Sequence, residues 1–163
     1  MDIDDFTGGY GFLSNFAPCP VRCLDDPDGP PYPSVEHAYQ ASKTLSAAQR
    51  LAVLAAPSPG AAKRLGRTVD LRADWDAVRG GVMLGLLRQK FAAEPYRSML
   101  AGTGEARLVE GNAWHDQEWG DCRCRAHAAE PGANLLGALL ELVRAEIADS
   151  PALAADREDR DGR

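Results

Sequence analysis

The chain has 163 residues, and its 18 Lys and Arg against 24 Asp and Glu give a formal net charge of −6. This length suits one domain that buries a proper core without disulfides. The acidic balance argues against sequence-independent nucleic-acid binding, which depends on clustered Lys and Arg. No apolar run approaches the roughly 20 residues of a membrane helix, so we expect no membrane partner.

The N-terminal half predicts loops followed by short helices. Residues 8–20 mix glycines, aromatics and prolines, which indicates short extended segments and turns, and residues 21–24 favour a strand. Ser34 is a typical N-cap for a helix over residues 35–43. Further helices are predicted over residues 46–56 and 58–66, bounded by Pro57 and Gly66. Residues 67–72 look like an extended link.

The C-terminal half predicts a longer helix over residues 74–91, a short one over 95–104 and a strand within 106–111. Residues 112–132 show no periodicity. A helix from residue 134 has a wide apolar face typical of the core. We therefore predict an α+β fold, mostly helical with a few short strands, forming a single domain over residues 1–149. Residues 150–163 are charged and are predicted to be a disordered tail.

The segment EGNAWHDQEWGDCRC, residues 110–124, allows three interpretations, and the first is a metal site. The segment contains three residues of types that bind zinc, His115, Cys122 and Cys124, and His127 follows shortly after it. Structural zinc sites usually draw four ligands from two separated pairs, so Cys19 and Cys23 are candidates for a second pair. The CxC spacing is tighter than the usual CxxC. We therefore expect a cysteine pair without metal, while the zinc interpretation stays open.

The second interpretation is a cysteine nucleophile beside a histidine. No helix N-terminus lies immediately behind Cys122 or Cys124 to lower a thiol pKa, and Asp121 would raise it, so this interpretation is disfavoured. The N-terminus lacks the basic start and apolar run of a signal peptide. We expect a cytoplasmic protein with reduced thiols.

The third interpretation is a pocket that holds a flat ring beside carboxylates. Its members are Trp114, Trp119, Asp116, Glu110 and, from the first predicted helix, Glu36. Base stacking on an aromatic side chain contributes about 1 to 3 kcal/mol, although tryptophans also serve as simple lids on a core. Positive charge gathers at Lys43, Lys63, Arg64, Arg67 and Arg72, where a solvated helix face competes with a phosphate site.

Seven motifs in order make the chain resemble the NADAR domain proteins, also called YbiA-like. They are GFLSNFAPCPV (11–21), YPSVEHAYQASK (32–43), AAKRLGR (61–67), LRADWDAVRGGVM (71–83), LRQKF (87–91), LVEGNAWHDQEWG (108–120) and GANLLGALLELVR (132–144). The resemblance covers almost the whole chain up to about residue 150. It departs from the family pattern at DCRCRAH (121–127), which follows the last tryptophan.

The resemblance implies an N-glycosidase that cleaves the bond between ribose C1 and an exocyclic amine of a base. Its substrate would be guanine carrying ADP-ribose, free or in nucleic acid, or else a ribosylamino-pyrimidine intermediate of riboflavin synthesis. Carried over by motif, Glu36 and Asp116 are the expected catalytic pair. Glu36 is the better candidate for contact with the ribose, and Asp116 is a base or a positioning group.

The resemblance also implies substrate-binding residues. Trp75 and Trp119 would wall or stack on the base and ribose, Asn15 and Phe16 would line the sugar or base edge, and the phosphate end would fall to Lys43, Lys63 and Arg72. Trp75 also fits a core position of its helix. We expect no cofactor, and the sequence indicates no oligomeric state. The alternatives from other classes are a module that binds ADP-ribose without hydrolysis and a zinc-binding structural protein.

Overall fold

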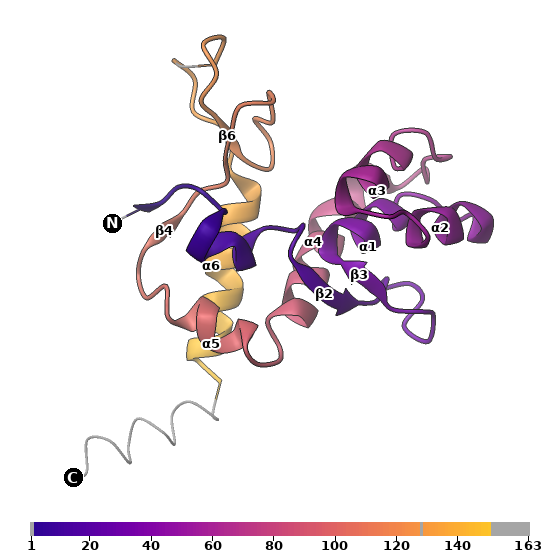
Figure 1. Ribbon diagram of the computed structural model, residues 1–163, viewed down its shortest axis with the longest axis horizontal. Coiled ribbons are helices and arrows are strands. Elements are labelled where there is room, and N and C mark those ends of the chain that lie inside the picture. Colours follow the sequence, from indigo (N-terminus) through magenta and orange to yellow (C-terminus); the bar gives the residue numbers. More distant parts are fainter. Residues whose placement is uncertain (1, 128, 151–163) are drawn as a thin grey trace. The chain divides into compact units, whose positions relative to one another are not determined.

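The computed structural model describes residues 2–127 and 129–150 (Figure 1). Its elements are β1 (Asp2–Ile3), the 3-10 helix η1 (Gly8–Leu13), β2 (Pro18–Val21), β3 (Tyr32–Ser34), α1 (Val35–Ala41), α2 (Ala47–Leu54), α3 (Pro59–Leu65), α4 (Trp75–Lys90), α5 (Tyr96–Ala101), β4 (Arg107–Leu108), β5 (Gly111–Asn112), β6 (Asp121–Cys122) and α6 (Leu135–Ala148). Helices with a few short strands confirm the predicted α+β class. Within the described residues, no helix is long and apolar enough to cross a membrane.

The contacts divide the chain into two compact units. The central unit is Asn15–Ala93, and the terminal unit joins the described residues up to Ser14 to those from Glu94 onward. The predicted domain over residues 1–149 runs through both units and stays a prediction. The predicted tail lies, apart from residue 150, outside the described residues.

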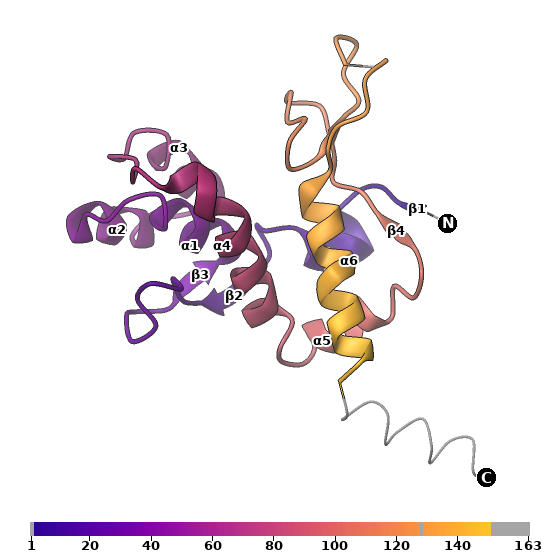
Figure 2. The same ribbon diagram turned by 180° about the vertical axis from the view of Figure 1, so that it is seen from behind.

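Helix α1 is the centre of the central unit, where it contacts α2, α3, α4 and the β2–β3 pair (Figures 1 and 2). All its residues are buried, including polar ones. The predicted cap is present, because the Ser34 hydroxyl accepts a hydrogen bond from the backbone N–H of His37 at 3.2 Å. Such caps satisfy N–H groups that have no partner inside the helix. Polar side chains on a fully buried helix need hydrogen-bond partners, either from the protein or from bound water or ligand.

Two predicted segments of the N-terminal half differ in the structure. Residues 8–13 form the 3-10 helix η1 rather than extended chain, and the strand β2 covers residues 18–21 rather than 21–24. The strand stops because a side chain takes the place of a neighbouring strand. The Gln89 amide accepts from the Arg22 backbone N–H at 2.8 Å and donates to the Arg22 carbonyl at 2.9 Å.

In the terminal unit, α6 packs against β4 and α5, and β1 pairs with β4 in parallel. The predicted strand over 106–111 is divided into β4 and β5. Here α6 side chains and its N-cap replace a neighbouring strand. Glu141 Oε1 accepts from Leu108 N at 2.7 Å, while the Asn134 amide donates to Leu108 O at 2.8 Å and accepts from Glu110 N at 3.0 Å.

Candidate functional site

Glu36 is a buried carboxyl in the first turn of α1, only 5% exposed. Burial raises its pKa from the ordinary value of 4.5, while the hydrogen bond from Gln40 and the charges of Lys63 and Lys43 act in the opposite direction. A carboxyl group that is costly to ionise and yet faces cations is the kind of group that enzymes use in acid–base chemistry. It is the most chemically distinctive group of the central unit.

Gln40 holds the Glu36 carboxyl from one turn further along α1. Its Nε2 donates to Glu36 Oε1 at 2.9 Å. Its side chain lies directly over Gly66 at the end of α3, where an added Cβ would come within 1.9 Å of Gln40 Oε1. Gly66 is therefore needed because only hydrogen fits beneath the amide.

Asn15 anchors the start of the same helix and carries a second amide. Its backbone carbonyl accepts from the Glu36 N–H at 3.0 Å. Its side-chain Nδ2 donates to Met83 Sδ at 3.5 Å, a weak acceptor. Asn15 Oδ1 and Gln40 Oε1 are buried oxygens without a hydrogen-bond partner among the described residues. Buried acceptors of this kind are rare, and both oxygens are available to a donor from water or a bound ligand.

Cations border the Glu36 carboxyl. Burial lowers the pKa of Lys43, Glu36 raises it, and the positive charges of Lys63 and Arg67 lower it further. Lys43 is half-buried with its Nζ 5.7 Å from the centre of the Tyr39 ring. A group of like charges this close repels itself and is stabilised by a bound anion. The arrangement suits the phosphate end of a nucleotide.

Trp75 occupies the first position of α4 and is 6% exposed. Its ring lies 5.1 Å from that of Tyr39, tilted by 59°. This contact fits the core position that the sequence allowed for Trp75. The Tyr39 ring thus lies near both the indole and the Lys43 ammonium, a link that the sequence did not suggest.

His37, next to the carboxyl, has a structural environment. Its Nε2 lies 3.2 Å from the carbonyl of Ala56 and its Nδ1 lies 2.7 Å from the Ser34 hydroxyl. Since a carbonyl only accepts, Nε2 carries the proton and Nδ1 accepts from Ser34. Both ring nitrogens are occupied, so His37 ties α1 to the end of α2.

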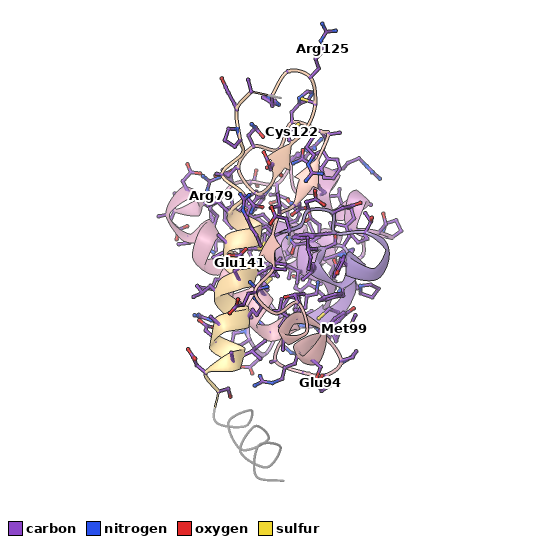
Figure 3. All side chains as sticks on the ribbon, turned by 90° about the vertical axis from the view of Figure 1, so that its left-hand side faces the viewer. Arg79, Glu94, Met99, Cys122, Arg125 and Glu141 are labelled. Atoms are coloured by element: carbon purple, nitrogen blue, oxygen red, sulfur yellow. The ribbon has the colours of Figure 1, made fainter. Side chains whose placement is uncertain are left out.

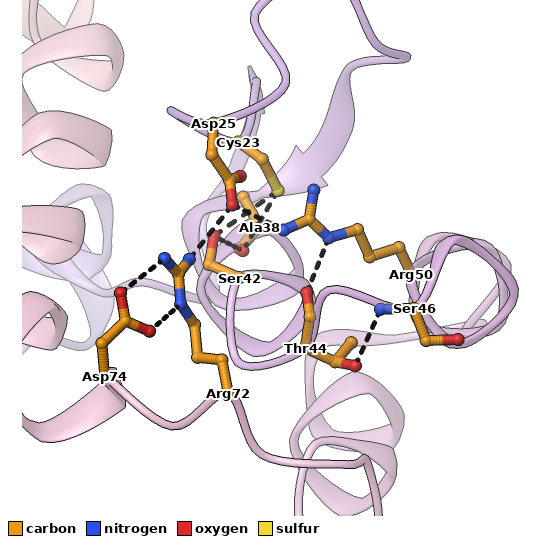
Figure 4. Close-up of polar contacts among 9 residues, drawn as sticks. All are labelled: Cys23, Asp25, Ala38, Ser42, Thr44, Ser46, Arg50, Arg72 and Asp74. Carbon is orange, nitrogen blue, oxygen red and sulfur yellow. Dashed lines mark hydrogen bonds and ion pairs between the residues drawn. The ribbon is translucent and has the colours of Figure 1, made fainter.

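Arg72 is held by carboxylates (Figure 4). Its guanidinium donates to both oxygens of Asp74, at 2.6 and 3.0 Å, and to Asp25 at 3.0 Å. Asp25 also pairs with Arg50 at 2.7 Å. These pairs raise the pKa of Arg72, first of all through Asp74. An anion that bound Arg72 would compete with these carboxylates, so Lys43 and Lys63 are better placed for a phosphate.

Asp116 lies in the terminal unit, in the loop of residues 112–134. Its Oδ1 accepts from the backbone N–H groups of Glu118 at 3.2 Å and Trp119 at 2.9 Å. Asn112 shapes the same turn, since its Oδ1 accepts from Asp116 N at 3.2 Å and its Nδ2 donates to Asp116 O at 2.7 Å. A carboxylate used in this way sets the path of the backbone. Trp119, half-buried, follows directly from this turn.

The remaining aromatic candidates are open to solvent. Phe16 is 44% exposed and Trp114 is 61% exposed. Large exposed aromatic side chains are suited to stacking on a ligand.

The cysteines take two different states, and all of them are free thiols. In the central unit, Cys23 donates to the Ala38 carbonyl at 3.6 Å and accepts from Ser42 at 3.5 Å, as a buried core thiol does. In the loop, Cys122 lies among Cys124, His115 and His127. Burial raises the pKa of Cys122, but hydrogen bonds from the Cys124 backbone, His127 and the Cys124 side chain together lower it to about 7.

The candidate residues thus fall into two groups, each assembled within its own unit. The central unit gathers Asn15, Glu36, Lys43, Lys63 and Trp75 around α1, and the terminal unit carries Asp116 and Trp119. Sequence reasoning missed Gln40, Tyr39 and Gly66 as parts of the first group. Gln40 had a signal, because it follows Glu36 by four residues on one helix face. Gly66 had none beyond its position after a helix.

Comparison with known proteins gives consistent relationships. A family model described as NADAR domain matches residues 5–148. The N-glycosidase YbiA of Escherichia coli is 37% identical over 142 residues, covering 85% of this chain and 82% of YbiA. An N-glycosidase of Nostoc punctiforme is 39% identical over 144 residues, covering 85% and 86%.

Other similar proteins carry different names or have known structures. The chloroplastic riboflavin biosynthesis protein PYRR of Zea mays is 34% identical over 152 residues, covering 85% of this chain and 23% of PYRR. The NMR structure of E. coli YbiA matches with a TM-score of 0.73 and 34% identity, over 91% of this chain and 87% of that one.

Proposed function

The chain belongs to the NADAR domain family, and we propose that, as an N-glycosidase, it removes ADP-ribose from ADP-ribosylated guanine. Glu36 carries this proposal. It is a buried carboxyl of raised pKa, bordered by Lys43 and Lys63. The same unit holds the amide oxygens of Asn15 and Gln40, which have no hydrogen-bond partner in the described part of the chain. Ribose hydroxyls and an exocyclic amine are donors, which is what these oxygens lack.

The reaction separates ribose C1 from the exocyclic nitrogen. As the bond breaks, positive charge develops at C1 and the electron pair leaves with the nitrogen. The ionised Glu36 carboxylate stabilises this charge, water supplies the hydroxyl at C1, and its proton goes to the leaving amine. The products are ADP-ribose and the unmodified base. A charge buried near the reacting atoms acts more strongly than one in water.

The cations suit the rest of this substrate. Lys43 and Lys63 would bind the diphosphate, because they repel each other until an anion is present. Both lie within electrostatic range of Glu36, so the phosphate end and the scissile bond can be held in one substrate. The acidic chain as a whole does not favour extended contact with nucleic acid, and a single flipped or unpaired base needs only a local site.

Asp116 and Trp119, on the 112–134 loop of the terminal unit, keep predicted roles in the reaction. We assign Asp116 a positioning role, since its Oδ1 holds the backbone N–H of Trp119. Trp119 would stack on the base. Phe16, Trp75 and Arg72 remain predicted substrate contacts.

A ribosylamino-pyrimidine phosphate is the second candidate substrate. The maize relative is named a riboflavin biosynthesis protein, which favours this alternative. The scissile bond is of the same kind, so the chemistry at Glu36 would be unchanged. The phosphate end differs, since only a monophosphate would meet Lys43 and Lys63.

The test uses purified protein and both substrates. Oligonucleotides with ADP-ribosylated guanine and, separately, the ribosylamino-pyrimidine phosphate are incubated with enzyme, and products are identified by mass spectrometry. We expect a higher kcat/KM on the first, with intact guanine restored. A higher kcat/KM on the ribosylamino-pyrimidine phosphate would make that compound the preferred substrate. Binding without any cleavage of either would support a nucleotide-binding module and contradict the proposal.

A further inference from the structure

Four soft or borderline metal ligands converge in the 112–134 loop of the terminal unit. The ligand atoms of His115, Cys122, Cys124 and His127 all lie within 4.8 Å of one another. Cys124 Sγ lies 3.3 Å from His115 Nδ1 and 3.2 Å from His127 Nδ1. In Figure 3, Cys122 lies towards the base of a loop whose tip carries Arg125.

These separations fit a tetrahedral ion. With Zn–S bonds of about 2.3 Å and Zn–N bonds of about 2.0 to 2.1 Å, ligand atoms around zinc lie roughly 3.3 to 3.8 Å apart. The Cys124–histidine distances are already close to this range, and the widest separation in the cluster exceeds it by about an ångström. The two imidazoles meet nearly edge to face, at 74° and with centres 5.3 Å apart, so they are not stacked on each other.

The loop backbone is arranged so that its ligands turn inward. His115 has a φ of 68°, in the left-handed region that side chains other than glycine seldom adopt. On the other side, Cys122 N donates to Gln117 Oε1 at 2.7 Å, and Gln117 Nε2 donates to the Glu130 carbonyl at 2.8 Å. His127 N donates to the Cys124 carbonyl at 3.0 Å, which closes the turn between these ligands. Outer hydrogen bonds of this kind orient ligands in metal sites.

The loop is held by hydrogen bonds rather than by long strands or an apolar core. Its β5 and β6 strands pair over only Gly111–Asp121 and Asn112–Cys122. Of its residues, Trp114 and His115 are exposed, whereas Cys122 is buried. Loops without an apolar core are commonly ordered by disulfides or metal ions. All cysteines here are free thiols.

We propose that His115, Cys122, Cys124 and His127 bind one zinc ion that orders the 112–134 loop. Four protein ligands leave no open position for water or substrate, so the ion has a structural role. On binding, both thiols lose their protons and the imidazoles bind as neutral ligands. The site would fix the turn that carries Asp116 and Trp119. The proposal does not depend on which N-glycoside is cleaved.

This inference differs from the expectation drawn from the sequence, which favoured a metal-free cysteine pair. The zinc interpretation of the sequence has Cys19 and Cys23 as candidates for the second ligand pair. In the structure, His115 and His127 are the groups that lie beside Cys122 and Cys124. The spacing of His115, seven residues before Cys122, gave no sign that the left-handed turn brings its ring back to Cys124.

The test is metal analysis of the full chain, purified without a histidine tag and under reducing conditions. We expect about one zinc per chain, and visible ligand-field bands of tetrahedral cobalt after exchange with Co²⁺. Cys124→Ser combined with His127→Ala should remove both signals. Cys19→Ala, which changes a buried thiol outside the cluster, should keep them.

A rescue variant guards against simple misfolding. His127→Cys retains four zinc ligands and should bind stoichiometric zinc with a cobalt spectrum shifted by the added thiolate. Protein that neither contains zinc nor takes up added Zn²⁺ or Co²⁺ stoichiometrically would overturn the proposal. So would full zinc content in the Cys124→Ser/His127→Ala variant, or a Cys122–Cys124 disulfide found by thiol counting.

Discussion

The α1 region of the central unit and the 112–134 loop of the terminal unit gather polar groups in opposite ways. Around α1, helices exclude water, and Glu36 is 5% exposed with its pKa raised by burial. In the loop, side chains such as Asn112 and Asp116 bind the backbone, and the strands are only two residues long. Reactivity can thus come from burial in a helical core, while a loop needs local bonds or an ion to hold its shape.

Replacing the buried carboxyl should have the largest effect. Glu36→Gln keeps an oxygen for Gln40 Nε2 but cannot become an anion, so kcat should fall about 10²- to 10⁴-fold. Single-turnover cleavage of ADP-ribosylated guanine measures this. Asp76→Asn is the matched control, because this α4 carboxylate is 92% exposed in its side chain. Equal losses in both variants would contradict the role of Glu36.

The same substitution should not weaken the fold. A raised Glu36 pKa means that the folded state binds the proton more tightly than the unfolded one. The wild type therefore loses stability as pH rises from the ordinary pKa of 4.5 through the raised one. Glu36→Gln should match or exceed the wild-type melting temperature at neutral pH, with the difference shrinking under acid conditions. A variant that is much less stable at neutral pH would show that the ionised carboxylate stabilises the fold.

A substitution that displaces Gln40 from the Glu36 carboxyl should have the next largest effect. In Gly66→Ala, the new Cβ would stand 1.9 Å from Gln40 Oε1, so Gln40 must move and release Glu36. Overpacking of this kind costs about 1 to 3 kcal/mol, and we expect kcat to fall as well. Gly60→Ala on α3 is the control, because its Cβ meets only Arg64 Nη1 at 3.8 Å. Thermal melts and kinetics of both variants test whether Gln40 positions Glu36.

In the 112–134 loop, the effect of substituting Asp116 on activity should depend on whether the new side chain keeps an acceptor oxygen, and not on its negative charge. Asp116→Asn keeps an acceptor for the N–H groups of Glu118 and Trp119, whereas Asp116→Ala removes it. If Asp116 is a positioning group, the kcat/KM of Asp116→Asn should stay within a few fold of the wild-type value. The kcat/KM of Asp116→Ala should fall further, because each lost hydrogen bond costs the loop about 1 kcal/mol of stability. Equally severe losses in both variants would indicate a catalytic base instead.

The smallest effect should come from the cations. Lys63→Gln removes one charge near Lys43 and raises the pKa of Glu36. At a pH well above that pKa, where Glu36 stays ionised in both proteins, KM should rise with little change in kcat. The difference should narrow at high salt, since the lysine is partly exposed. Arg79→Gln, on the solvent side of α4 with a 34% exposed side chain, serves as the charge-matched control. An unchanged KM would remove Lys63 from the phosphate site.

The sequence predicted the helices well, and Ser34 caps α1 as expected. Ser46 and Ser58, at the starts of the next two predicted helices, cap α2 and α3 in the same way. It was weaker where side chains replace strands. Gln89 ends β2 at Arg22, and Asn134 and Glu141 divide the strand predicted near Leu108. Such pairings join residues far apart in the chain and leave no local pattern.

For the site, motif resemblance selected Glu36, and helix spacing placed it in the first turn of α1. The spacing of Glu36 and Gln40 puts both on one helix face, but it gave no sign that both are buried, which depends on the close approach of α3 at Gly66. The convergence of His115 with Cys124 was likewise hidden, because it requires a left-handed residue. Contacts that depend on one unusual backbone angle, or on a glycine that leaves room for a neighbour, cannot be predicted from the spacing of residues in the sequence.

The pH dependence of kcat/KM on ADP-ribosylated guanine tests the central claim most directly. If ionised Glu36 stabilises the developing charge, activity should rise with pH through an acid limb whose pKa lies above the ordinary 4.5. Because the charge of Lys43 lowers that pKa, the limb should move to still higher pH in Lys43→Gln. An acid limb at or below the ordinary value, or one that Lys43→Gln leaves in place, would contradict the account.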